Sequence, residues 1–379
     1  MKIIGVTGTS GKTTTTTLLY RIATALGHKA GLIGTVENLI AGEKILTDFT
    51  TPEALELNKF LSNMQEKGCE YVFMEVSSHG MEEKRVAGLN FTGGIFTNLT
   101  HDHLDYHRNM EAYFLAKKKF FEMLGSKAFA LSNTDSEYGI RMFEDIKARR
   151  HSYGFSKTEN FHGEIKKSDI DGLELNFNGT NIHSKLLGKF NAYNLLAVWA
   201  TCELLGFDMS KVGEILQDID PPTGRFNHYM SKDGVLVIVD YAHKPDALLN
   251  VLRTTKEIKT KGGRIISVFG CGGDRDPFKR PLMGKIGAEL SDIVIFTSDN
   301  SRTEDPEKII EQMKKDLTRE DLNKVTTVID RRMAIQRSIE LAKNGDIILC
   351  AGKGHEDYQE VNGVKTHFND LEEFKKILS

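Results

Sequence analysis

Short apolar runs alternate with longer amphipathic stretches along the whole chain, and this alternation leaves few folds open. The runs are rich in valine, isoleucine and phenylalanine, and several end in a polar cluster. Continuous apolar strands separated by helical segments are typical of a mostly parallel sheet covered by helices. The sequence therefore predicts an α/β fold. The predicted strands are Ile3–Thr7, Tyr71–Val76, Ile95–Asn98, Val235–Asp240, Ile265–Phe269, Ile293–Thr297 and Ile347–Cys350.

The segments between the predicted strands include clear helices. Leu18, Ile22 and Leu26 follow one another at helical spacing, and Gly27 stands where such a helix would stop. Residues 185–219 are also predicted to be helical.

The chain of 379 residues is long enough for two domains at about 150 residues each. Proline and glycine, which interrupt helices and strands, concentrate at Asp220–Gly224. We therefore place one domain at 1–222 and a second at 223–379. Weak alternation and turn residues in 150–185 predict antiparallel strands at an edge of the first domain.

Composition excludes several classes of protein. The 50 basic and 53 acidic side chains leave a net charge of −3. The chain thus lacks the excess of basic residues that is typical of proteins that bind nucleic acid. No apolar run approaches the length of a membrane span, and the four cysteines form no C-x-x-C pair. We expect a cytoplasmic protein with neither a membrane nor a nucleic-acid partner, whose cysteines are buried thiols.

A glycine-rich loop stands between the first predicted strand and the first helix. Glycines let backbone N–H groups turn toward phosphate oxygens, and the following helix contributes the positive end of its dipole. Lys12 would reach the β- and γ-phosphates, and the Thr13 hydroxyl would face Mg²⁺. Val6 stands where the usual P-loop has its first glycine, so this is a shortened variant. We predict nucleotide binding. The loop residues are Gly8, Thr9, Ser10, Gly11, Lys12, Thr13 and Thr14.

Two other strands of the first domain lead into polar clusters. Glu75 ends one strand and could hold Mg²⁺ beside the phosphates, although an acid at a strand end is common. Residues 97–107 are rich in histidine and aspartate, which suits metal or phosphate chemistry. A dinuclear zinc signature would need histidine at Tyr106 and fails there. The basic run after Ala116, taken alone, is best explained as a solvated helix face with Phe120 and Phe121 turned inward.

The second domain repeats this arrangement. A dinucleotide fingerprint starting at Gly270 would need glycine at Arg275, so an NAD site is disfavoured. Ligands of open α/β sheets bind outside the carboxyl ends of strands, and arginine with carboxylates suits a zwitterionic ligand. The clusters are Asp240–His243, Gly270–Asp276, Ser298–Arg302 and Gly352–Glu356.

Taken together, these motifs resemble those of the Mur ligases, and most closely those that add the third residue to UDP-N-acetylmuramoyl-L-alanyl-D-glutamate. The resemblance implies a P-loop domain with a mostly parallel sheet, followed by a smaller Rossmann-like α/β domain. It also implies an ATP-dependent amide ligase of peptidoglycan biosynthesis that works through an acyl phosphate. The matching segments, in family order, are TGTSGKTT, DFTTPEAL, MEVSSHG, TNLTHDHLDYH, Ala116–Lys117, GKFNAYN, TGRF, VDYAH, FGCGGDRD, SDNSR and AGKGHEDYQ.

The resemblance also assigns roles to individual residues. Lys12 would contact the phosphates, Thr13 and Glu75 would hold one Mg²⁺, and His103 with a carbamylated Lys117 would hold a second. Lys118 and Lys119 would keep the solvated role. The remaining nucleotide positions, at the adenine and from the second domain, would be Asn191, Asn194, Arg225 and Asp240.

The two other substrates would be a nucleotide-sugar peptide acceptor and an amino acid, with meso-diaminopimelate favoured because Arg302 suits its distal carboxylate. The acceptor positions would be Thr50, Thr51, Ser77 and Arg85, and the amino-acid positions Arg275, Asp299, Asn300, Arg302, Gly352 and Glu356.

Three departures from the family pattern leave alternatives open. Ser301 replaces a proline, which would make its loop less rigid, and Glu83 replaces a glutamine near the anionic acceptor. The family carries an N-terminal domain of about a hundred residues for the uridine nucleotide, and we expect this chain to lack it because the loop begins at Gly8. The alternatives are an acceptor without UDP, a partner chain that supplies the UDP site, or a nucleotide-binding partner protein without ligase activity.

Overall fold

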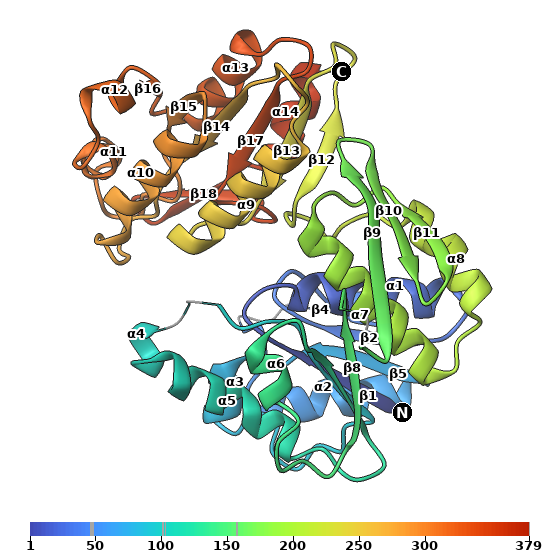
Figure 1. The fold of residues 1–379 in the computed structure, drawn as a ribbon. Helices are drawn as coiled ribbons and strands as arrows, with labels where there is room; N and C mark the ends of the chain where they lie inside the picture. The colour runs from blue at the N-terminus through green and yellow to red at the C-terminus, as the bar shows by residue number, and fades with distance from the viewer. Residues whose placement is uncertain (46–48, 101, 103, 157, 379) are drawn as a thin grey trace. The chain divides into compact units, whose positions relative to one another are not determined.

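The computed structural model describes residues 1–379 except 46–48, 101, 103, 157 and 379. The chain divides into two compact units, Met1–Pro222 and Thr223–Ser379. Both combine a largely parallel sheet with covering helices (Figure 1), which confirms the predicted α/β class. None of the described helices is long and apolar enough to cross a membrane.

The first unit is built on one large sheet. Its described strands lie in the order β11-β10-β9-β8-β7-β6-β1-β5-β2-β3-β4, with parallel pairing from β9 to β2 and antiparallel pairing at both edges. The elements are β1 Lys2–Thr7, α1 Lys12–Ala25, β2 Ala30–Ile33, β3 Asn38–Ile40, β4 Glu43–Ile45, α2 Ala54–Glu66, β5 Tyr71–Glu75, α3 Ser78–Glu82, β6 Gly93–Phe96, α4 Leu104–His107, α5 Met110–Glu122, β7 Phe129–Asn133, α6 Glu137–Arg141, β8 Arg149–Gly154, β9 Phe161–Asp169, β10 Gly172–Phe177, β11 Thr180–Ser184, α7 Lys189–Leu205 and α8 Met209–Asp218.

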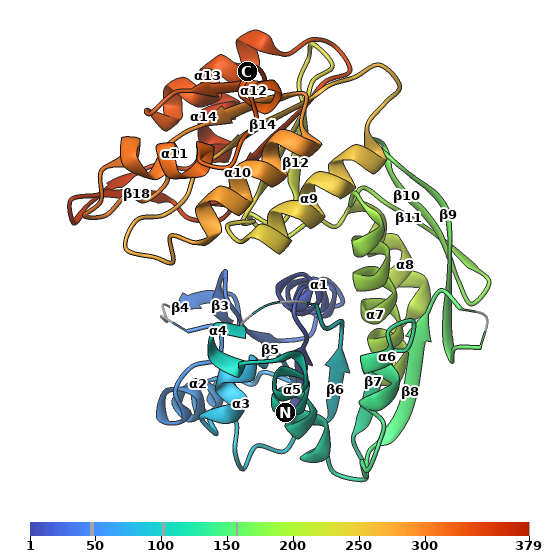
Figure 2. The same cartoon turned by 60° about the vertical axis from the view of Figure 1, so that its left-hand side comes forward.

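Two apolar cores lie on opposite faces of this sheet. Successive side chains of a strand point to opposite faces, so Ile3 joins one core while Ile4 joins the other. Helices α1, α7 and α8 cover the face of Ile4, and α2, α3 and α5 cover the face of Ile3. Figure 2 shows these two groups of helices from the side. The central strand β1 is thereby buried on both faces, and its carboxyl end carries the glycine-rich loop.

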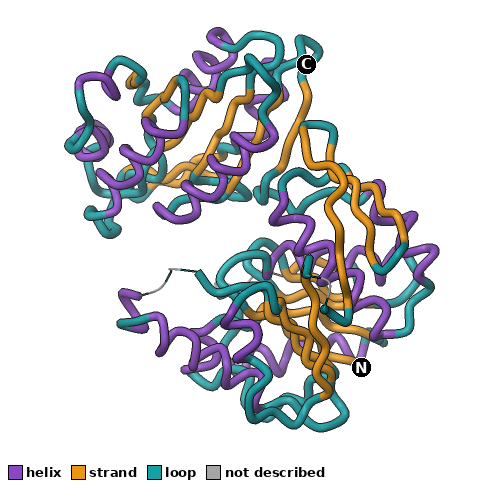
Figure 3. Tube along the Cα trace, viewed as in Figure 1, coloured by secondary structure: helices purple, strands orange, loops and turns teal. Residues whose placement is uncertain are grey.

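The second unit has a six-stranded sheet in the order β12-β13-β17-β14-β15-β16, where the described strands pair in parallel except β12. Helices α13 and α14 pack into the core on one face, and α9 and α10 lie on the other (Figures 1 and 3). A separate hairpin, β18–β19, follows β17. The elements are β12 Asn227–Met230, β13 Leu236–Asp240, α9 Pro245–Ile258, β14 Ile265–Phe269, α10 Lys279–Leu290, β15 Ile293–Phe296, α11 Pro306–Lys314, α12 Arg319–Leu322, β16 Val325–Thr327, α13 Arg331–Leu341, β17 Ile347–Ala351, β18 Tyr358–Val361, β19 Val364–His367 and α14 Asp370–Leu378.

All seven predicted strands are confirmed to within two residues at each end. The predicted helical region 185–219 is two helices, α7 and α8, because Gly206 adopts a left-handed conformation that ends the first. The antiparallel prediction for 150–185 holds for β9, β10 and β11 but is wrong for β8, which pairs in parallel with both of its neighbours. The four cysteines are free and buried, as expected.

Candidate active site

Two glycines shape the loop after β1. Gly8 has a φ of 148°, and Gly11, the N-cap of α1, has a φ of 85°. A Cβ atom on Gly8 would lie 1.9 Å from Thr97 Oγ1, and one on Gly11 would lie 2.4 Å from Asn194 Oδ1. Because glycine alone tolerates both restrictions, the chain can turn tightly into α1. The first N–H groups of a helix have no carbonyl partner within the helix, so the start of α1 is suited to phosphate.

The segment after β6 holds the tip of the loop. Thr9 N donates to Asn98 O at 2.9 Å, and Ser10 N donates to Asn98 Oδ1 at 3.0 Å. The Thr97 hydroxyl donates to Ser10 O at 2.7 Å. Part of the polar cluster at 97–107 therefore fixes the phosphate loop through hydrogen bonds.

Two lysine side chains converge on the same carbonyl of the loop. Lys12 Nζ donates to Gly8 O and Thr9 O, each at 2.9 Å. Lys117 Nζ, from α5, donates to Gly8 O at 2.8 Å and lies 4.5 Å from the centre of the Tyr113 ring. The structure thus brings Lys117 to the loop, although Lys117 and Gly8 are far apart in sequence.

The environment of Lys117 favours the neutral amine. The side chain is 1% exposed, and this burial lowers the pKa of Lys117 well below its ordinary value. The positive charge of Lys12 lowers the pKa further, while the negative charge of Asp102 opposes the shift. A neutral amine keeps its lone pair and can act as a nucleophile.

The prediction that Lys118 is solvated is wrong, whereas Lys119 is solvated as expected. Lys118 is 5% exposed, and its Nζ donates to the carbonyls of Arg141 and Met142 at 2.9 and 3.2 Å, at the end of α6. A lysine can satisfy the unpaired carbonyls of a helix end in this way. Lys119 is half-exposed and pairs with Glu82 at 2.6 Å.

Glu75 ends β5 beside the loop, because it is the parallel partner of Val6. Its carboxylate is 1% exposed and accepts from Thr35 N at 2.8 Å and from Thr35 Oγ1 at 3.1 Å. Thr13 is buried in the first turn of α1. His103 lies outside the described residues, and the described part of the chain contains no cluster of three or more His, Cys, Asp or Glu side chains that could hold a metal ion.

The acceptor positions predicted in this unit form one connected network with Glu75. Thr51 Oγ1 lies 2.9 Å from Glu75 O, to which it donates, and accepts from Ser77 N at 3.0 Å. The hydroxyl oxygens of Thr50 and Thr35 lie 3.0 Å apart. The structure therefore brings Thr50, Thr51 and Ser77 to the carboxyl end of β5.

Arg85 joins the same network and is already paired with carboxylates. Its Nη1 donates to Thr51 O at 2.8 Å, and its Nη2 contacts Glu53 at 2.9 Å and also Glu83. The guanidinium lies 4.4 Å from the centre of the Phe49 ring. Glu83, the departure noted in the sequence, thus neutralises the one cation of the predicted acceptor positions.

Asn191 and Asn194 lie at the start of α7, beneath the loop. Both are buried, and Asn194 Nδ2 donates to Asn191 Oδ1 at 3.0 Å, while Asn191 Nδ2 donates to Leu187 O at 2.9 Å. Asn194 closely approaches Gly11. The pair supports the loop, and its contact with adenine stays a prediction.

In the second unit, Asp240 ends β13 and organises the turn that carries Arg225. Its two carboxylate oxygens accept from Phe226 N and Ala242 N, both at 2.8 Å. Burial raises the pKa of Asp240 to about 6, against the opposing charge of Arg225 and these two hydrogen bonds. The guanidinium of Arg225 lies 5.0 Å from the centre of the Tyr241 ring.

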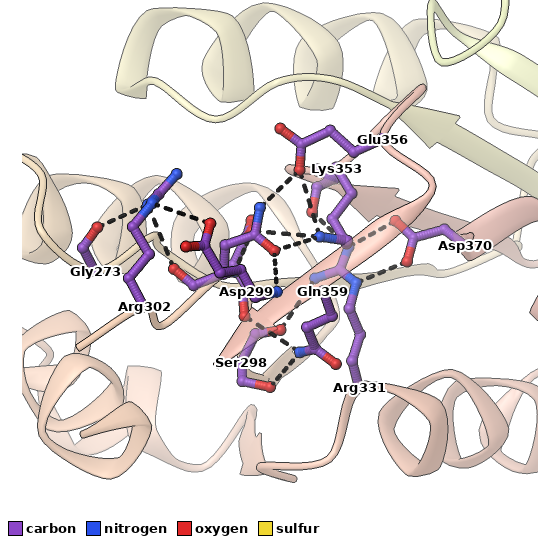
Figure 4. A network of polar contacts seen from close by, with 12 residues as sticks. Gly273, Ser298, Asp299, Arg302, Arg331, Lys353, Glu356, Gln359 and Asp370 are labelled. Atoms are coloured by element: carbon purple, nitrogen blue, oxygen red, sulfur yellow. Dashed lines mark hydrogen bonds and ion pairs between the residues drawn. The ribbon is translucent and has the colours of Figure 1, made fainter. Parts of the chain in front are cut away.

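A buried polar network joins the ends of β15 and β17 (Figure 4). Lys353, which is 0% exposed, donates through Nζ to Asn300 Oδ1 at 2.9 Å and to Glu356 Oε2 at 3.4 Å. Asp299 Oδ1 lies 3.9 Å from the same ammonium, and Asn300 Nδ2 donates to Glu356 Oε2 at 2.9 Å. The structure therefore brings three predicted amino-acid positions around one lysine.

The pKa values of the two acids in this network, Asp299 and Glu356, are shifted in opposite directions. Burial opposes ionisation of Asp299, but Lys353 and Arg331 hold its pKa below the ordinary value. Burial, followed by the charge of Asp299, raises the pKa of Glu356, although Lys353 counters both.

Arg302 lies beside this network and is held mainly by backbone groups. Its Nη1 donates to Gly273 O at 2.7 Å, and its N donates to Glu360 O at 3.1 Å. Its carbonyl accepts from Asn362 N at 2.6 Å, so the hairpin β18–β19 clamps the residue on both sides. Arg302 has a φ of 50°, and Ser301 before it is 1% exposed. The hairpin supplies a restraint on this loop where the usual proline is absent.

Gly352 and Arg275 complete the predicted positions of this unit. Gly352 has a φ of 116°, and a Cβ there would lie 2.7 Å from Asp299 Oδ2. Its N donates to Asp240 O at 3.1 Å. Arg275, in contrast, is exposed in the segment between β14 and α10, and its role stays a prediction.

Two features of this region were missed in the sequence. Lys353 lies inside a recognised motif, so its spacing could have identified it. Arg331 and Asp370 have side chains that are 0% exposed and form a paired contact, Nε to Oδ1 and Nη2 to Oδ2, at 2.7 Å each. Arg331 also donates to Ala351 O at 3.1 Å. These two residues begin helices α13 and α14, and no motif signals them.

Comparison with known proteins is consistent with this geometry. The Mur ligase middle domain matches residues 6–202, and the Mur ligase, glutamate ligase domain matches residues 224–354. The UDP-N-acetylmuramoyl-L-alanyl-D-glutamate–2,6-diaminopimelate ligase of Parabacteroides distasonis is 49% identical over 379 residues, which is 100% of this chain and 78% of the relative. The same-named ligase of Cytophaga hutchinsonii is 48% identical over 378 residues, with the same coverage.

A solved structure of a ligase with this name is 35% identical, with a TM-score of 0.72, and the match covers 100% of this chain and 78% of that one. Both units and their order along the chain thus agree with one family. The chain belongs to the Mur ligases, which are ATP-dependent ligases that join a carboxylic acid to an amino acid.

Proposed function

We propose that the protein joins an amino group of meso-diaminopimelate to the D-glutamyl carboxylate of a UDP-N-acetylmuramoyl-L-alanyl-D-glutamate acceptor, with hydrolysis of ATP to ADP and phosphate. The observation that carries this proposal is the grouping of Arg302, Asn300 and Glu356 at neighbouring strand ends. A guanidinium suits a distal carboxylate and a carboxylate suits a distal ammonium. The names of relatives 49% and 48% identical over this chain support the same substrates.

The chemistry requires an activated carboxylate, because a carboxylate and an amine do not condense in water unaided. Transfer of the γ-phosphoryl group gives an acyl phosphate, which the amine attacks, and phosphate leaves. The protein contributes positioning and charge neutralisation in such reactions. The backbone N–H groups at the start of α1 and the ammonium of Lys12 are the groups that we assign to the phosphates. We extend the ATP assignment to Arg225, Asp240, Asn191 and Asn194.

Mg²⁺ is the metal that the family uses, and the oxygen donors of Thr13 and Glu75 suit it. Oxygen ligands are what this ion prefers, and it commonly takes its remaining ligands from phosphates and water. Thr13 and Glu75 would hold one ion, while His103 and a carbamylated Lys117 would hold a second. When bound, the ions neutralise phosphate charge.

The carbamate at Lys117 is supported by the burial and lowered pKa of this amine. A neutral amine attacks CO₂, so that an N–C bond forms, one C–O π bond opens onto oxygen, and the ammonium proton passes to water. The product is an anionic oxygen ligand, which attracts a metal ion, whereas a protonated Lys117 would repel it.

On the acceptor side, we assign Thr50, Thr51, Ser77 and Arg85 to the muramoyl dipeptide, on the strength of their shared network at the end of β5. We also propose that the protein works in the cytoplasm, where its four buried free cysteines would stay reduced.

The test is phosphate release from ATP with the UDP-linked acceptor and meso-diaminopimelate, L-lysine or no amino acid. Release that depends on meso-diaminopimelate is expected. Release with L-lysine alone would contradict the choice of amino acid. An acceptor without UDP that gives the same KM would refute the role of UDP, and release that requires an added second polypeptide would indicate a partner chain.

A further inference from the structure

Lys353 is a fully buried cation that the proposed roles leave without a function. It follows Gly352 at the carboxyl end of β17, and its side chain is 0% exposed. A buried ammonium is costly unless charges and hydrogen bonds compensate it. Here the compensation comes from three side chains, those of Asp299, Asn300 and Glu356, all of which belong to the amino-acid positions.

The ammonium determines which way the Asn300 amide faces. Asn300 Oδ1 accepts from Lys353 Nζ at 2.9 Å and from Glu360 N at 3.0 Å. Both partners can only donate, so the oxygen of the amide must face them. The NH₂ group is thereby turned to Glu356, where it donates to Oε2 at 2.9 Å.

Glu356 is in turn held by one of its two oxygens. Oε2 accepts hydrogen bonds from both Asn300 Nδ2 and Lys353 Nζ. Oε1 accepts no hydrogen bond from the described residues, and Figure 4 shows it turned away from the network. An ionised carboxylate has several acceptor sites, so this oxygen can receive a cation.

We propose that Lys353 is a positioning residue of the amino-acid site, which fixes the Asn300 amide and the Glu356 carboxylate so that Glu356 Oε1 receives the distal ammonium of the incoming amino acid. This inference rests on the proposed function. Lys353 itself does not touch the substrate. Its action is to keep one carboxylate oxygen occupied and the other directed outward.

The test compares Lys353→Met with a matched control, Lys324→Met, in the full chain. The Lys324 side chain donates to the carbonyl of Ala288 and makes none of the hydrogen bonds of the network. For Lys353→Met we expect the KM for meso-diaminopimelate to rise about tenfold or more while the KM for ATP stays unchanged, since hydrogen bonds to charged groups are lost only at the amino-acid site. Lys324→Met should change neither KM. Lys353→Gln, which keeps a donor without the charge, should fall between Lys353→Met and the unmodified protein.

A pH profile separates positioning from a general structural role. Glu356 faces Lys353 and Asp299, and also the phenols of Tyr241 and Tyr358. Loss of Lys353 removes the charge that lowers the pKa of Glu356, so the acidic limb of kcat/KM for meso-diaminopimelate should move to higher pH. In a Glu356→Gln background, Lys353→Met should add little, because both changes act through one carboxylate.

An unchanged KM for meso-diaminopimelate, equal effects on both substrates, an unmoved acidic limb or additive effects in the double variant would each overturn the proposal. Failure of both Lys353 variants to fold would show that Lys353 holds the fold and would also overturn it. If the unmodified protein shows no release dependent on meso-diaminopimelate, the proposed function fails, and this inference with it. A normal unmodified protein with an unaffected Lys353→Met variant refutes only the inference.

Discussion

The glycine-rich loop of the first unit and the polar network of the second differ in the groups that form them, which are backbone groups in the loop and side chains in the network. The loop consists of backbone groups, shaped by Gly8 and Gly11 and held by hydrogen bonds that Thr9 and Ser10 donate to Asn98. The network consists of charged and amide side chains that are mostly buried, with Lys353 at its centre. Backbone N–H groups suit phosphate, a ligand of fixed shape and high charge, whereas side chains can match the particular charges of one amino acid.

The difference predicts how each region responds to change. A backbone site depends on what fits around the chain and fails when a side chain enters. A network of buried charges depends on balance and fails when one partner is removed, because the other charge is left buried and unpaired. Substitutions at matched positions can break or sharpen this distinction.

The largest effect is expected at Lys117, where the loop itself depends on a buried side chain. Lys117→Ala should lower the rate of ligation by about a thousandfold or more, since a charge-stabilising group of the reaction is lost. ATP binding, measured separately, should remain. Lys119→Ala is the control, because this residue of the same helix is half-exposed and its ammonium pairs with Glu82. Normal turnover by Lys117→Ala would remove its role.

The second largest effect concerns stability in the second unit. Arg331→Met leaves Asp370 buried and unpaired, so the free energy of unfolding should fall by about 3–5 kcal/mol. Arg332→Met is the matched control, since the next residue pairs with Glu373 on the same helix α14 but is 57% exposed. It should cost less than about 1 kcal/mol. Denaturant unfolding of both variants checks this, and equal losses would show that burial of the pair does not matter.

Gly11→Ala tests the loop in the same manner. The left-handed backbone costs an alanine about 1–2 kcal/mol, and the added Cβ also meets Asn194 Oδ1 at 2.4 Å. We expect ATP affinity to fall about tenfold to a hundredfold as the loop shifts. Gly27→Ala shares the positive φ, 90°, but its Cβ would meet nothing within 4 Å. Gly27→Ala should therefore lose stability without losing ATP affinity, as measured by calorimetry, and a matching loss of affinity would exclude the collision as the cause.

These contrasts also explain how far the sequence could predict the molecule. Glycine spacing and strand ends identified the loop and most of its neighbours, because both are local properties of the chain. Lys118 was assigned to solvent because helical period alone does not reveal that α6 ends against it. Arg331 and Asp370 are 39 residues apart, so their pairing depends on tertiary packing. The parallel pairing of β8 likewise depends on which strands lie beside it.

A pH profile probes Asp240, whose carboxylate accepts from the backbone N–H groups of Phe226 and Ala242. With a pKa raised to about 6 by burial, it takes up a proton as the pH falls through 6, and a protonated oxygen conflicts with a facing N–H donor. We expect kcat/KM for ATP to fall about tenfold per unit below pH 6. Because the folded state binds this proton more tightly than the unfolded state, the contribution of Asp240 to stability rises as the pH falls from 6 toward 4. A rate that stays constant down to pH 5 would contradict this.

The smallest effect is expected at Glu83. Here the first unit, like the second, contains a cluster of charged side chains that pair with one another. Arg85 is 8% exposed and pairs with both Glu53 and Glu83, so an anionic acceptor must compete with two carboxylates of the protein for one guanidinium. Glu83→Gln removes one competitor and keeps the shape of the side chain. The KM for the acceptor should fall about twofold to fivefold, in keeping with the modest energy of a partly exposed ion pair. Glu82→Gln is the control, since its carboxylate pairs with Lys119 instead. A higher acceptor KM in Glu83→Gln would mean that Glu83 orients Arg85 for the acceptor, and the first unit would then use a balanced charge cluster just as the second does.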